Sequence, residues 1–335
     1  MIEQKVIAML RKGPVEIKDI AIKLETTQKE ITNIIKLLKF QAYPLVKTNK
    51  GWLINKSKID PKLGLKFPYP SREDNTFLFG FIGDTHLGSK YERLDVLNDL
   101  YDIFELEGVD RVYHAGNWVE GECNFNRHEL IVHGMDSQME YLVENYPKKD
   151  FATFAITGDD HEGWWGQRSG IDVGSHLQSI MRNNGRIDWF DLGFMEGYTE
   201  LVNSNSGKRT QLLTMHPGGG SAYALSYKPQ KIVESFSGGE KPSVLLIGHY
   251  HKMSYNMIRG VHTIQVGCTQ DQTTFLRKKS IEAHVGGGIC RLTQDPRTGL
   301  IFSCRVEFFR YYNKGFMNNK WNYKNCVAKP LKSLT

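Results

Sequence analysis

Short apolar runs, each bounded by glycine or polar residues, recur through the middle of the chain. Runs of this length and composition predict strands buried on both faces. The five clearest runs are Phe77–Gly83, Val109–Tyr113, Phe151–Ile156, Gln211–Met215 and Ser243–Ile247. We therefore expect an open α/β arrangement in this part of the chain.

The first 58 residues have a different periodicity. Apolar residues recur there three or four positions apart, which predicts three short helices at residues 2–10, 15–24 and 27–38. Gly13-Pro14 separates the first two helices, and Thr27-Gln28-Lys29-Glu30 matches a capping box that opens the third. Two short runs on either side of Thr48–Gly51 then predict a β-hairpin.

Each apolar run in the middle of the chain is followed by a segment rich in metal-ligating side chains. The segments are Asp84-Thr85-His86, Gly116-Asn117-Trp118-Val119-Glu120, Gly158-Asp159-Asp160-His161-Glu162, His216, and Gly248-His249-Tyr250-His251. Ligands in open α/β sheets gather at the carboxyl ends of strands, so we expect these side chains to meet. Imidazoles mixed with carboxylate and amide oxygens suit Mn, Fe, Zn or Ni better than Ca or Mg. The pattern predicts a transition-metal site.

The ordered set of five segments resembles the calcineurin-like metallophosphoesterase superfamily, whose pattern is D-x-H, G-D-x-x-D, G-N-H-[ED], H and G-H-x-H. The resemblance spans Thr76 to Cys304. It implies an α/β fold with a metallophosphoesterase β-sandwich flanked by helices, and the N-terminal pattern adds a small winged-helix domain before it. It also implies hydrolysis of phosphate esters with two divalent transition-metal ions, Mn being preferred over Fe, Zn and Ni.

Carried over position by position, the resemblance implies a role for each ligand. One metal would be held by Asp84, His86 and His251, and the second by Asp160, His216 and His249, with Asn117 between them. His161 would give a proton to the leaving group, and Glu120 would orient that histidine. A carboxylate that holds one imidazole nitrogen fixes the tautomer and raises the pKa of the ring, which favours general acid catalysis.

Two positions depart from the family pattern. The metal-bridging Asp of the family is Asn117 here, and the Asn ligand of its third segment is Asp160. Together they look like an exchange of Asp and Asn, which moves one negative charge across the site and keeps the total. A neutral amide oxygen is a poorer bridge between two cations than a carboxylate.

Four further residues are candidates for contact with the substrate. His128 and His133 lie in a Gly121–Gly134 loop after the second segment, where the family often places phosphate-contacting side chains. Trp164 and Trp165 follow the third segment and could stack on a base, although packing in the core is the simpler expectation for both.

The N-terminal pattern of three helices and a hairpin resembles a winged helix-turn-helix domain. In that family the third helix enters the major groove and the wing contacts the DNA backbone. The residues that would be presented to DNA are Gln28, Lys29, Asn33, Lys36, Lys39, Lys47 and Lys50. The alternative is a winged helix used only for protein interaction or packing. We expect this domain at residues 1–58, a proline-containing linker at 59–75, the catalytic domain at 76–304 and a basic, aromatic extension at 305–335.

The charge of the chain is unevenly distributed. Residues 1–60 hold 12 Lys or Arg against 6 Asp or Glu, and residues 304–335 hold 7 against 1, whereas the whole chain has a net charge of +6. The middle is therefore acidic, as a site rich in carboxylates requires, and the basic ends suit phosphate backbones. No run approaches the ~18 apolar residues of a membrane span. Five cysteines without a C-x-x-C pair favour a reducing cytoplasm.

These features predict a metal-dependent phosphodiesterase that acts on DNA, similar in its catalytic half to SbcD-type exonucleases. An alternative is a phosphatase or nucleotide phosphodiesterase that is recruited by its winged helix. A third hypothesis is a catalytically weak phosphoesterase body that serves as a structural or DNA-binding subunit, which Asn117 favours. The sequence leaves the oligomeric state open.

Overall fold

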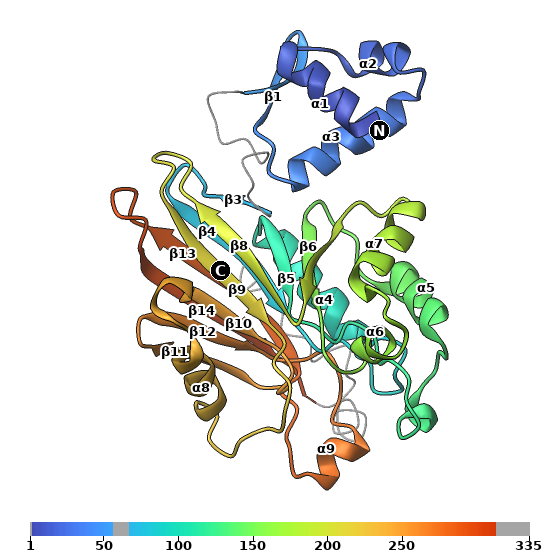
Figure 1. Cartoon of the computed structure of the whole chain (residues 1–335), viewed down its shortest axis with the longest axis vertical. Helices are drawn as coiled ribbons and strands as arrows, with labels where there is room; N and C mark the ends of the chain where they lie inside the picture. Colours follow the sequence, from blue (N-terminus) through green and yellow to red (C-terminus); the bar gives the residue numbers. More distant parts are fainter. Residues whose placement is uncertain (1, 56–66, 313–335) are drawn as a thin grey trace. The chain divides into compact units, whose positions relative to one another are not determined.

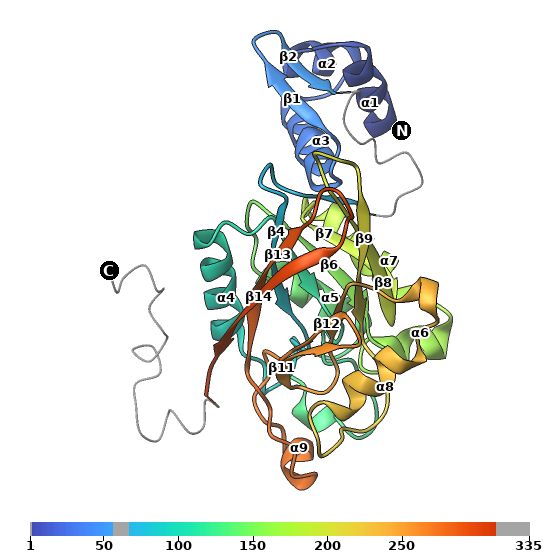
Figure 2. The ribbon, with the colours of Figure 1, turned by 90° about the vertical axis from the view of Figure 1, so that its left-hand side faces the viewer.

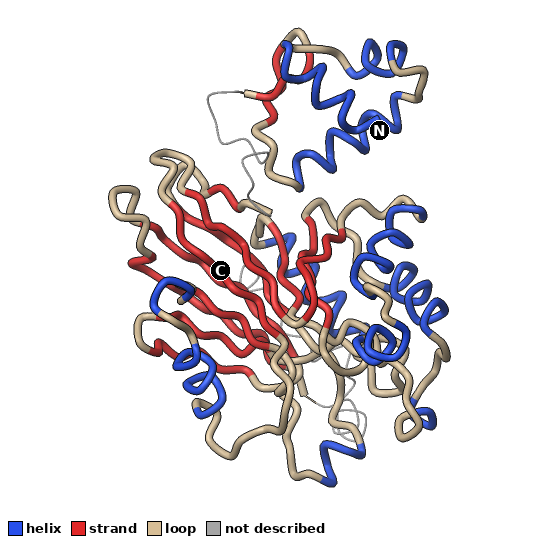
Figure 3. The backbone as a smooth tube through the Cα atoms, viewed as in Figure 1, coloured by secondary structure: helices blue, strands red, loops and turns tan. Residues whose placement is uncertain are grey.

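The computed structural model describes residues 2–55 and 67–312. Figure 1 follows the chain by colour, and Figure 3 separates its helices from its strands. The chain divides into two compact units, one of Met1–Thr76, Thr199–Thr210 and Gln294–Leu300 and one of Phe77–Tyr198, Gln211–Thr293 and Ile301–Thr335. The expected domain boundaries stay a prediction, since residues 59–66 of the linker and 313–335 of the C-terminal extension lie outside the described residues. No helix in the described ranges has the length and apolarity that crossing a membrane requires.

Residues 2–55 form three helices and a two-stranded antiparallel hairpin. The elements are α1 (Ile2–Lys12), α2 (Ile17–Lys23), α3 (Gln28–Phe40), β1 (Leu45–Thr48) and β2 (Gly51–Ile54). The side chain of Thr27 caps α3, since its hydroxyl oxygen accepts a hydrogen bond from the Glu30 N–H at 3.1 Å. The apolar stripes of the helices pack into one small core of Val6, Ile7, Leu10, Ile20, Ala21, Ile31, Ile35, Leu38 and Ile54. The predicted elements are therefore present.

The remaining described strands build two six-stranded sheets. One sheet has the order β11-β12-β10-β9-β8-β3, with β3 (Tyr69–Pro70), β8 (Glu196–Val202), β9 (Arg209–Met215), β10 (Val244–Ile247), β11 (Met253–Ile258) and β12 (Val261–Val266). The other has the order β14-β13-β4-β5-β6-β7, with β4 (Thr76–Ile82), β5 (Arg111–His114), β6 (Ala152–Thr157), β7 (Trp189–Phe194), β13 (Gly286–Gln294) and β14 (Ile301–Arg310). The sheets lie against each other, so that a side chain at Gly197 of β8 would meet Ile156 of β6.

Helices flank this sandwich. The described helices that follow β4 are α4 (Leu94–Leu106), η1 (Arg127–Glu129), α5 (Met135–Asn145), α6 (Gly163–Ser169), α7 (Val173–Asn183), α8 (Tyr227–Ser235), η2 (Gly238–Glu240) and α9 (Thr274–Lys278). In Figures 1 and 2, α4, α5 and α7 lie along the sheet that contains β4 to β7, and α8 lies beside β11 of the other sheet. Every residue of β4 is buried because both of its faces are covered. The predicted fold class, an α/β protein with a β-sandwich flanked by helices, is confirmed.

The sheet topology fixes where the ends of five strands lie. β4, β5 and β6 are mutually parallel neighbours in one sheet, and β9 and β10 are parallel neighbours in the other. Parallel neighbours present their carboxyl ends at the same edge, so residues that follow these strands are brought together from five distant parts of the chain.

Candidate metal centre

The five ligand-bearing segments follow the five strands as the sequence predicted. β4 ends two residues before Asp84, β6 ends three residues before Asp160, and β9 ends directly before His216. Asn117 follows β5 and His249 follows β10 in the same way. All five side chains therefore lie at the carboxyl ends of the strands.

Asp84, His86 and His251 form one group of ligand atoms. The Nε2 atoms of the two histidines are 3.3 Å apart, and His251 Nε2 lies 3.5 Å from Asp84 Oδ1. The third distance, from His86 Nε2 to Asp84 Oδ1, is 3.9 Å. All three side chains are buried, and their ligand atoms all lie within 4.8 Å of one another.

Asp160, His216 and His249 form a second group, which Asp159 joins. His216 Nε2 is 3.4 Å from Asp160 Oδ1 and 3.3 Å from His249 Nδ1. The other ring nitrogens are held by backbone carbonyls: His216 Nδ1 lies 2.6 Å from the Ala115 oxygen, and His249 Nε2 lies 2.7 Å from the Gly219 oxygen. A carbonyl that holds one ring nitrogen leaves the other as the metal-facing atom.

Asn117 supplies a further oxygen donor. Its Oδ1 atom is buried and has no hydrogen-bond partner, a costly arrangement for an isolated amide oxygen. Its backbone N–H donates to Glu162 Oε1 at 2.9 Å, which keeps the residue in place. The orphaned oxygen, the carboxylates and the metal-facing imidazoles together fit divalent transition-metal ions.

Six residues of the site have left-handed backbone conformations. They are Asp84 (φ 49°), His86 (φ 49°), Asn117 (φ 53°), His161 (φ 51°), His249 (φ 75°) and His251 (φ 52°). Such a conformation costs about 1–3 kcal/mol for each residue that has a side chain, and it persists only where the surroundings enforce it. Hydrogen bonds between the turns do so here, since the Asp84 N–H donates to the Gly116 oxygen at 2.9 Å and the His86 N–H to the Asn117 oxygen at 3.0 Å.

Glycines allow these turns to approach one another. A Cβ atom at Gly116 would lie 2.5 Å from His216 Nδ1, and one at Gly158 would lie 2.3 Å from Asn117 Oδ1. At Gly248 it would lie 2.2 Å from the Ala115 oxygen. Three of the segments therefore begin with glycine because any side chain there would overlap atoms of the neighbouring segments.

Burial and charge perturb the titration of the site. Burial raises the pKa of Asp84 to about 7. Burial alone would lower the pKa of His216, but the carboxylates of Asp160 and Asp84 outweigh it and raise the pKa to about 9. Burial and the neighbouring imidazoles hold the pKa of His251 well below its usual range. So many ionisable groups in one buried volume indicate a functional centre.

His161 and Glu120 lie beside the first group of ligands. His161 Nδ1 is 2.7 Å from the backbone oxygen of Glu120 and 3.8 Å from its carboxylate. The same carboxylate lies 3.1 Å from His86 Nδ1 and accepts a hydrogen bond from Gln270 Nε2 at 2.8 Å. Glu120 therefore holds the ring of His86 with its carboxylate and that of His161 with its carbonyl. The catalytic roles of His161 and Glu120 stay predictions.

The candidate substrate contacts are found in different surroundings. Trp165 is buried in the core between the sheet and its helices, whereas the ring of Trp164 stacks on that of His161 with centroids 4.8 Å apart. The side chains of His128 and His133 are largely exposed, and their ion-pair contacts are with Glu129 at 3.7 Å and Glu122 at 3.9 Å.

The residues expected to meet DNA are on the surface of the N-terminal part. Lys36 is half-buried, with its ammonium group over the ring of Phe40. The other six are exposed: Gln28, Lys29, Asn33, Lys39, Lys47 and Lys50.

Three residues of the site were not among the predicted ligands. Glu162 is fully buried, and its Oε1 accepts the N–H groups of Asn117 and Gly158, both at 2.9 Å. Asp159 joins the second group of ligands. Both belong to the third segment, so the acidic run there was the available signal. Gln270, which donates to Glu120, belongs to no motif, and only the tertiary structure reveals it.

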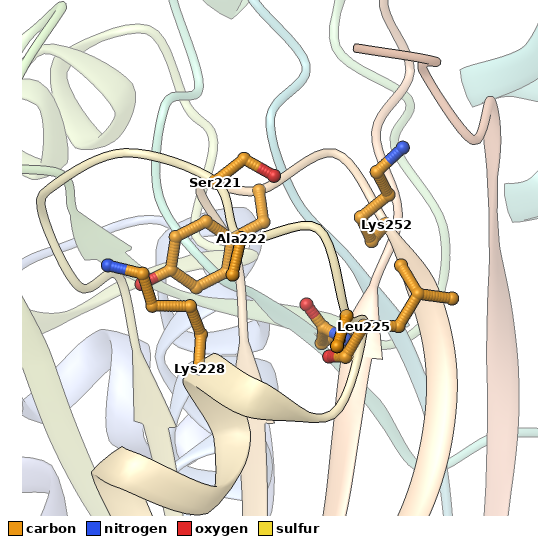
Figure 4. Close-up of a pocket in the computed structure, with 8 residues that line it drawn as sticks. Ser221, Ala222, Leu225, Lys228 and Lys252 are labelled. Atoms are coloured by element: carbon orange, nitrogen blue, oxygen red, sulfur yellow. The ribbon is translucent and has the colours of Figure 1, made fainter.

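A small pocket lies beside the loop that follows His216. Figure 4 shows Ser221, Ala222, Leu225, Lys228 and Lys252 around it. Its volume is about 10 Å³, which is room for one water molecule, whereas pockets for drug-sized ligands have ~300–1,000 Å³. This pocket is therefore not a substrate cavity.

Comparisons with known proteins give structural likeness without a sequence match. No protein-family model matches the chain, and no curated protein matches it either. Among solved structures, an archaeal phosphodiesterase is 13% identical and covers 70% of this chain and 100% of its own, with a TM-score of 0.35. The Escherichia coli phosphoesterase Yfce is also 13% identical and covers 68% of this chain and 98% of its own, with a TM-score of 0.35.

A third solved structure, a predicted phosphoesterase from Streptococcus pneumoniae, is 12% identical. It covers 70% of this chain and 98% of its own, with a TM-score of 0.33. The chemistry that this chain can perform therefore follows from the geometry of its own strand ends.

Proposed function

We propose that this protein is a metal-dependent phosphodiesterase that hydrolyses DNA. The observation that carries the proposal is the pair of adjacent ligand groups, Asp84, His86 and His251 beside Asp160, His216 and His249, at the carboxyl ends of parallel strands. Buried ionisable groups and left-handed residues that have side chains cost free energy, and such costs are typical of functional sites.

The first group would hold one divalent ion, and the second group together with Asp159 would hold another. Asn117 Oδ1, a buried oxygen without a hydrogen-bond partner, could bind either ion. Such ions, when bound, clamp phosphate oxygens and lower the pKa of a bound water, which makes it a nucleophile at neutral pH. Imidazole donors favour Mn, Fe, Zn or Ni, and Mn is our first choice.

The remaining chemistry belongs to side chains of the protein. His161 Nδ1 is held by the Glu120 carbonyl, which leaves Nε2 as the atom that can give a proton to the departing oxygen. Trp164 stacks on His161 and limits its rotation. Glu120 and Gln270 together fix the ring of His86, so that ligand geometry is set before substrate arrives.

DNA is preferred to a small phosphate ester because of the N-terminal part. Residues 1–60 carry twice as many basic as acidic residues, and the candidate contacts on α3 and the hairpin are mostly exposed. Phosphate backbones attract such a surface through release of their counterions. The N-terminal part would therefore bind DNA as a winged helix, with α3 as its recognition helix.

The test is digestion of linear duplex DNA, single-stranded DNA and mononucleotides by the full-length protein, with added Mn²⁺ and with EDTA. We expect Mn²⁺-dependent cleavage of DNA that is faster than turnover of nucleotides. His86→Ala should abolish it, whereas the control His176→Ala should not, since His176 is half-exposed and pairs with Asp136. No cleavage by metal-loaded protein would refute the proposal, and faster turnover of nucleotides would favour the nucleotide phosphodiesterase hypothesis.

The third hypothesis, a catalytically weak subunit, is favoured by one observation. Asn117 is a neutral amide where the family resemblance implies a metal-bridging ligand, and a carboxylate there would attract both ions more strongly. Elemental analysis together with a hydrolysis assay on the same purified protein separates the two hypotheses. A stoichiometric metal content without hydrolysis of any phosphodiester would support the weak subunit and refute the enzyme hypothesis.

A further inference from the structure

Two cysteines that belong to none of the ligand segments lie side by side on neighbouring strands. Cys290 belongs to β13 and Cys304 to β14, which are neighbours in one sheet, and their Sγ atoms are 3.8 Å apart. A disulfide has an S–S length of about 2.05 Å, so the two sulfurs must approach by about 1.8 Å. β14 is the last strand in the order of the described sheet, so it is hydrogen-bonded to a neighbouring strand on one side and is less constrained than a central strand.

The two thiols have different surroundings. Cys290 is fully buried, and burial raises the pKa of its thiol. Cys304 is only partly buried, and it is within hydrogen-bond reach of Cys290, His262 and Tyr255. These hydrogen bonds lower the pKa of the Cys304 thiol to about 5, the bond with Cys290 having the largest effect. Thiolates rather than thiols are nucleophilic, so the two cysteines differ in reactivity.

His262 and Tyr255 come from the facing sheet and complete the cluster. The Tyr255 hydroxyl lies 2.8 Å from His262 Nδ1, and the two rings are stacked, with an interplanar angle of 13°. Tyr255 is 39% exposed, whereas His262 is buried. A partly exposed cysteine, a buried second thiol and a histidine form the usual surroundings of an oxidation-sensitive cysteine with a resolving partner.

We propose that Cys304 and Cys290 are a redox-modification site, in which Cys304 reacts with a hydroperoxide and Cys290 then closes a reversible disulfide between β13 and β14. This site does not depend on the proposed hydrolase activity. The other two described cysteines have no second thiol as a hydrogen-bond partner. The Cys268 thiol is buried and donates hydrogen bonds to the Gln270 and His284 carbonyls, and the Cys123 thiol donates to Asn126 Oδ1.

The chemistry balances in two steps. The Cys304 thiolate attacks one peroxide oxygen, the O–O bond breaks, and the other oxygen leaves and takes up a proton, which yields a sulfenic acid and water or an alcohol. Cys290 sulfur then attacks the sulfur of Cys304. An S–S bond forms as the S–O bond breaks, and hydroxide leaves with the thiol proton as a second water. The two cysteines lose two electrons and two protons, and the peroxide gains them.

The test uses the full-length protein treated with hydrogen peroxide, alkylated and digested without reduction for mass spectrometry. We expect a peptide pair that links Cys304 to Cys290 and is lighter by two hydrogens, and a drop from five titratable thiols to three in denaturant. Dithiothreitol should restore all five. A link from Cys304 to Cys326 or Cys123, or no link at all, would overturn the proposal.

Variants separate the roles of the two thiols. Cys290→Ser keeps a hydrogen-bond donor beside Cys304 and should leave Cys304 as a sulfenic acid that dimedone traps, whereas Cys304→Ser should leave Cys290 unmodified. Cys123→Ser is the matched control, because Cys123 is also partly exposed, and it should form the link at the same rate as the parent protein. Equal peroxide reactivity of both cysteines in the two single variants would contradict the assigned order. If Cys290→Ser does not fold, the peptide map of the parent protein still decides whether the link forms.

Discussion

Gly158→Ala tests the proposed site with a single methyl group. Gly158 opens the third ligand segment, and its backbone is not left-handed, so alanine suits the main chain. The added Cβ would nevertheless lie 2.3 Å from Asn117 Oδ1 and 3.2 Å from His216 Cδ2. The conflict is therefore with two side chains of the metal centre and not with the fold.

The size of the effect follows from this distance. Since Cβ atoms essentially never approach another heavy atom closer than 3.0 Å, the Asn117 amide must move by at least 0.7 Å. A misplacement of about 1 Å at a catalytic centre costs about 10²-fold in rate, which corresponds to about 2.7 kcal/mol. The free energy of unfolding should change less, because rotation of one amide relieves the overlap.

The assay is kcat/KM for bis(p-nitrophenyl) phosphate, with metal content and thermal unfolding measured on the same preparations. We expect Gly158→Ala to lose about 10²-fold in kcat/KM, with a lower metal content and a nearly unchanged unfolding temperature. Gly239→Ala is the control, since no atom lies within 4 Å of its added Cβ. If Gly158→Ala keeps full activity and metal, the oxygen of Asn117 has no role in the centre.

Three further predictions concern the ligands and the basic surface. His251→Ala should lose one metal ion and nearly all hydrolysis, because it removes one of three donors in its group, and elemental analysis that finds the full complement would contradict the assignment. The effects of Asn117→Asp and Asp160→Asn on metal affinity should be coupled by ~0.5–3 kcal/mol. Each substitution alone changes the total charge of the candidate ligands, and the two together restore it. Simple additivity in a double-variant cycle would refute the proposed exchange of Asp and Asn. Lys29→Glu should weaken duplex binding and flatten the slope of log affinity against log salt concentration by about 0.9, whereas the control Lys5→Glu should leave the slope unchanged. Equal slopes for the two variants in a salt titration would favour a winged helix that binds protein instead of DNA.

Much of the fold was predictable because its signals are local. A buried strand needs an apolar run, and a helix needs apolar residues at helical spacing, so the positions of β4, β6 and α3 follow from a few adjacent residues. Helix α3 begins directly after Thr27, as the capping pattern of Thr27 to Glu30 predicted. The strand order was not predictable in this way, since it depends on contacts between segments that are distant in the chain.

The candidate ligands could be named from the sequence, whereas the atoms that hold them in place are known only from the tertiary structure. Asp84, His216 and His251 could be named because each directly follows a strand or belongs to a short motif. Which atoms hold those ligands depends on how the strand ends meet. The Glu120 carboxylate lies closer to His86 than to His161, and the Ala115 carbonyl holds His216, contacts that span 34 and 101 residues. No periodicity or spacing encodes such contacts, because they arise only when two sheets bring separate strand ends into one buried volume.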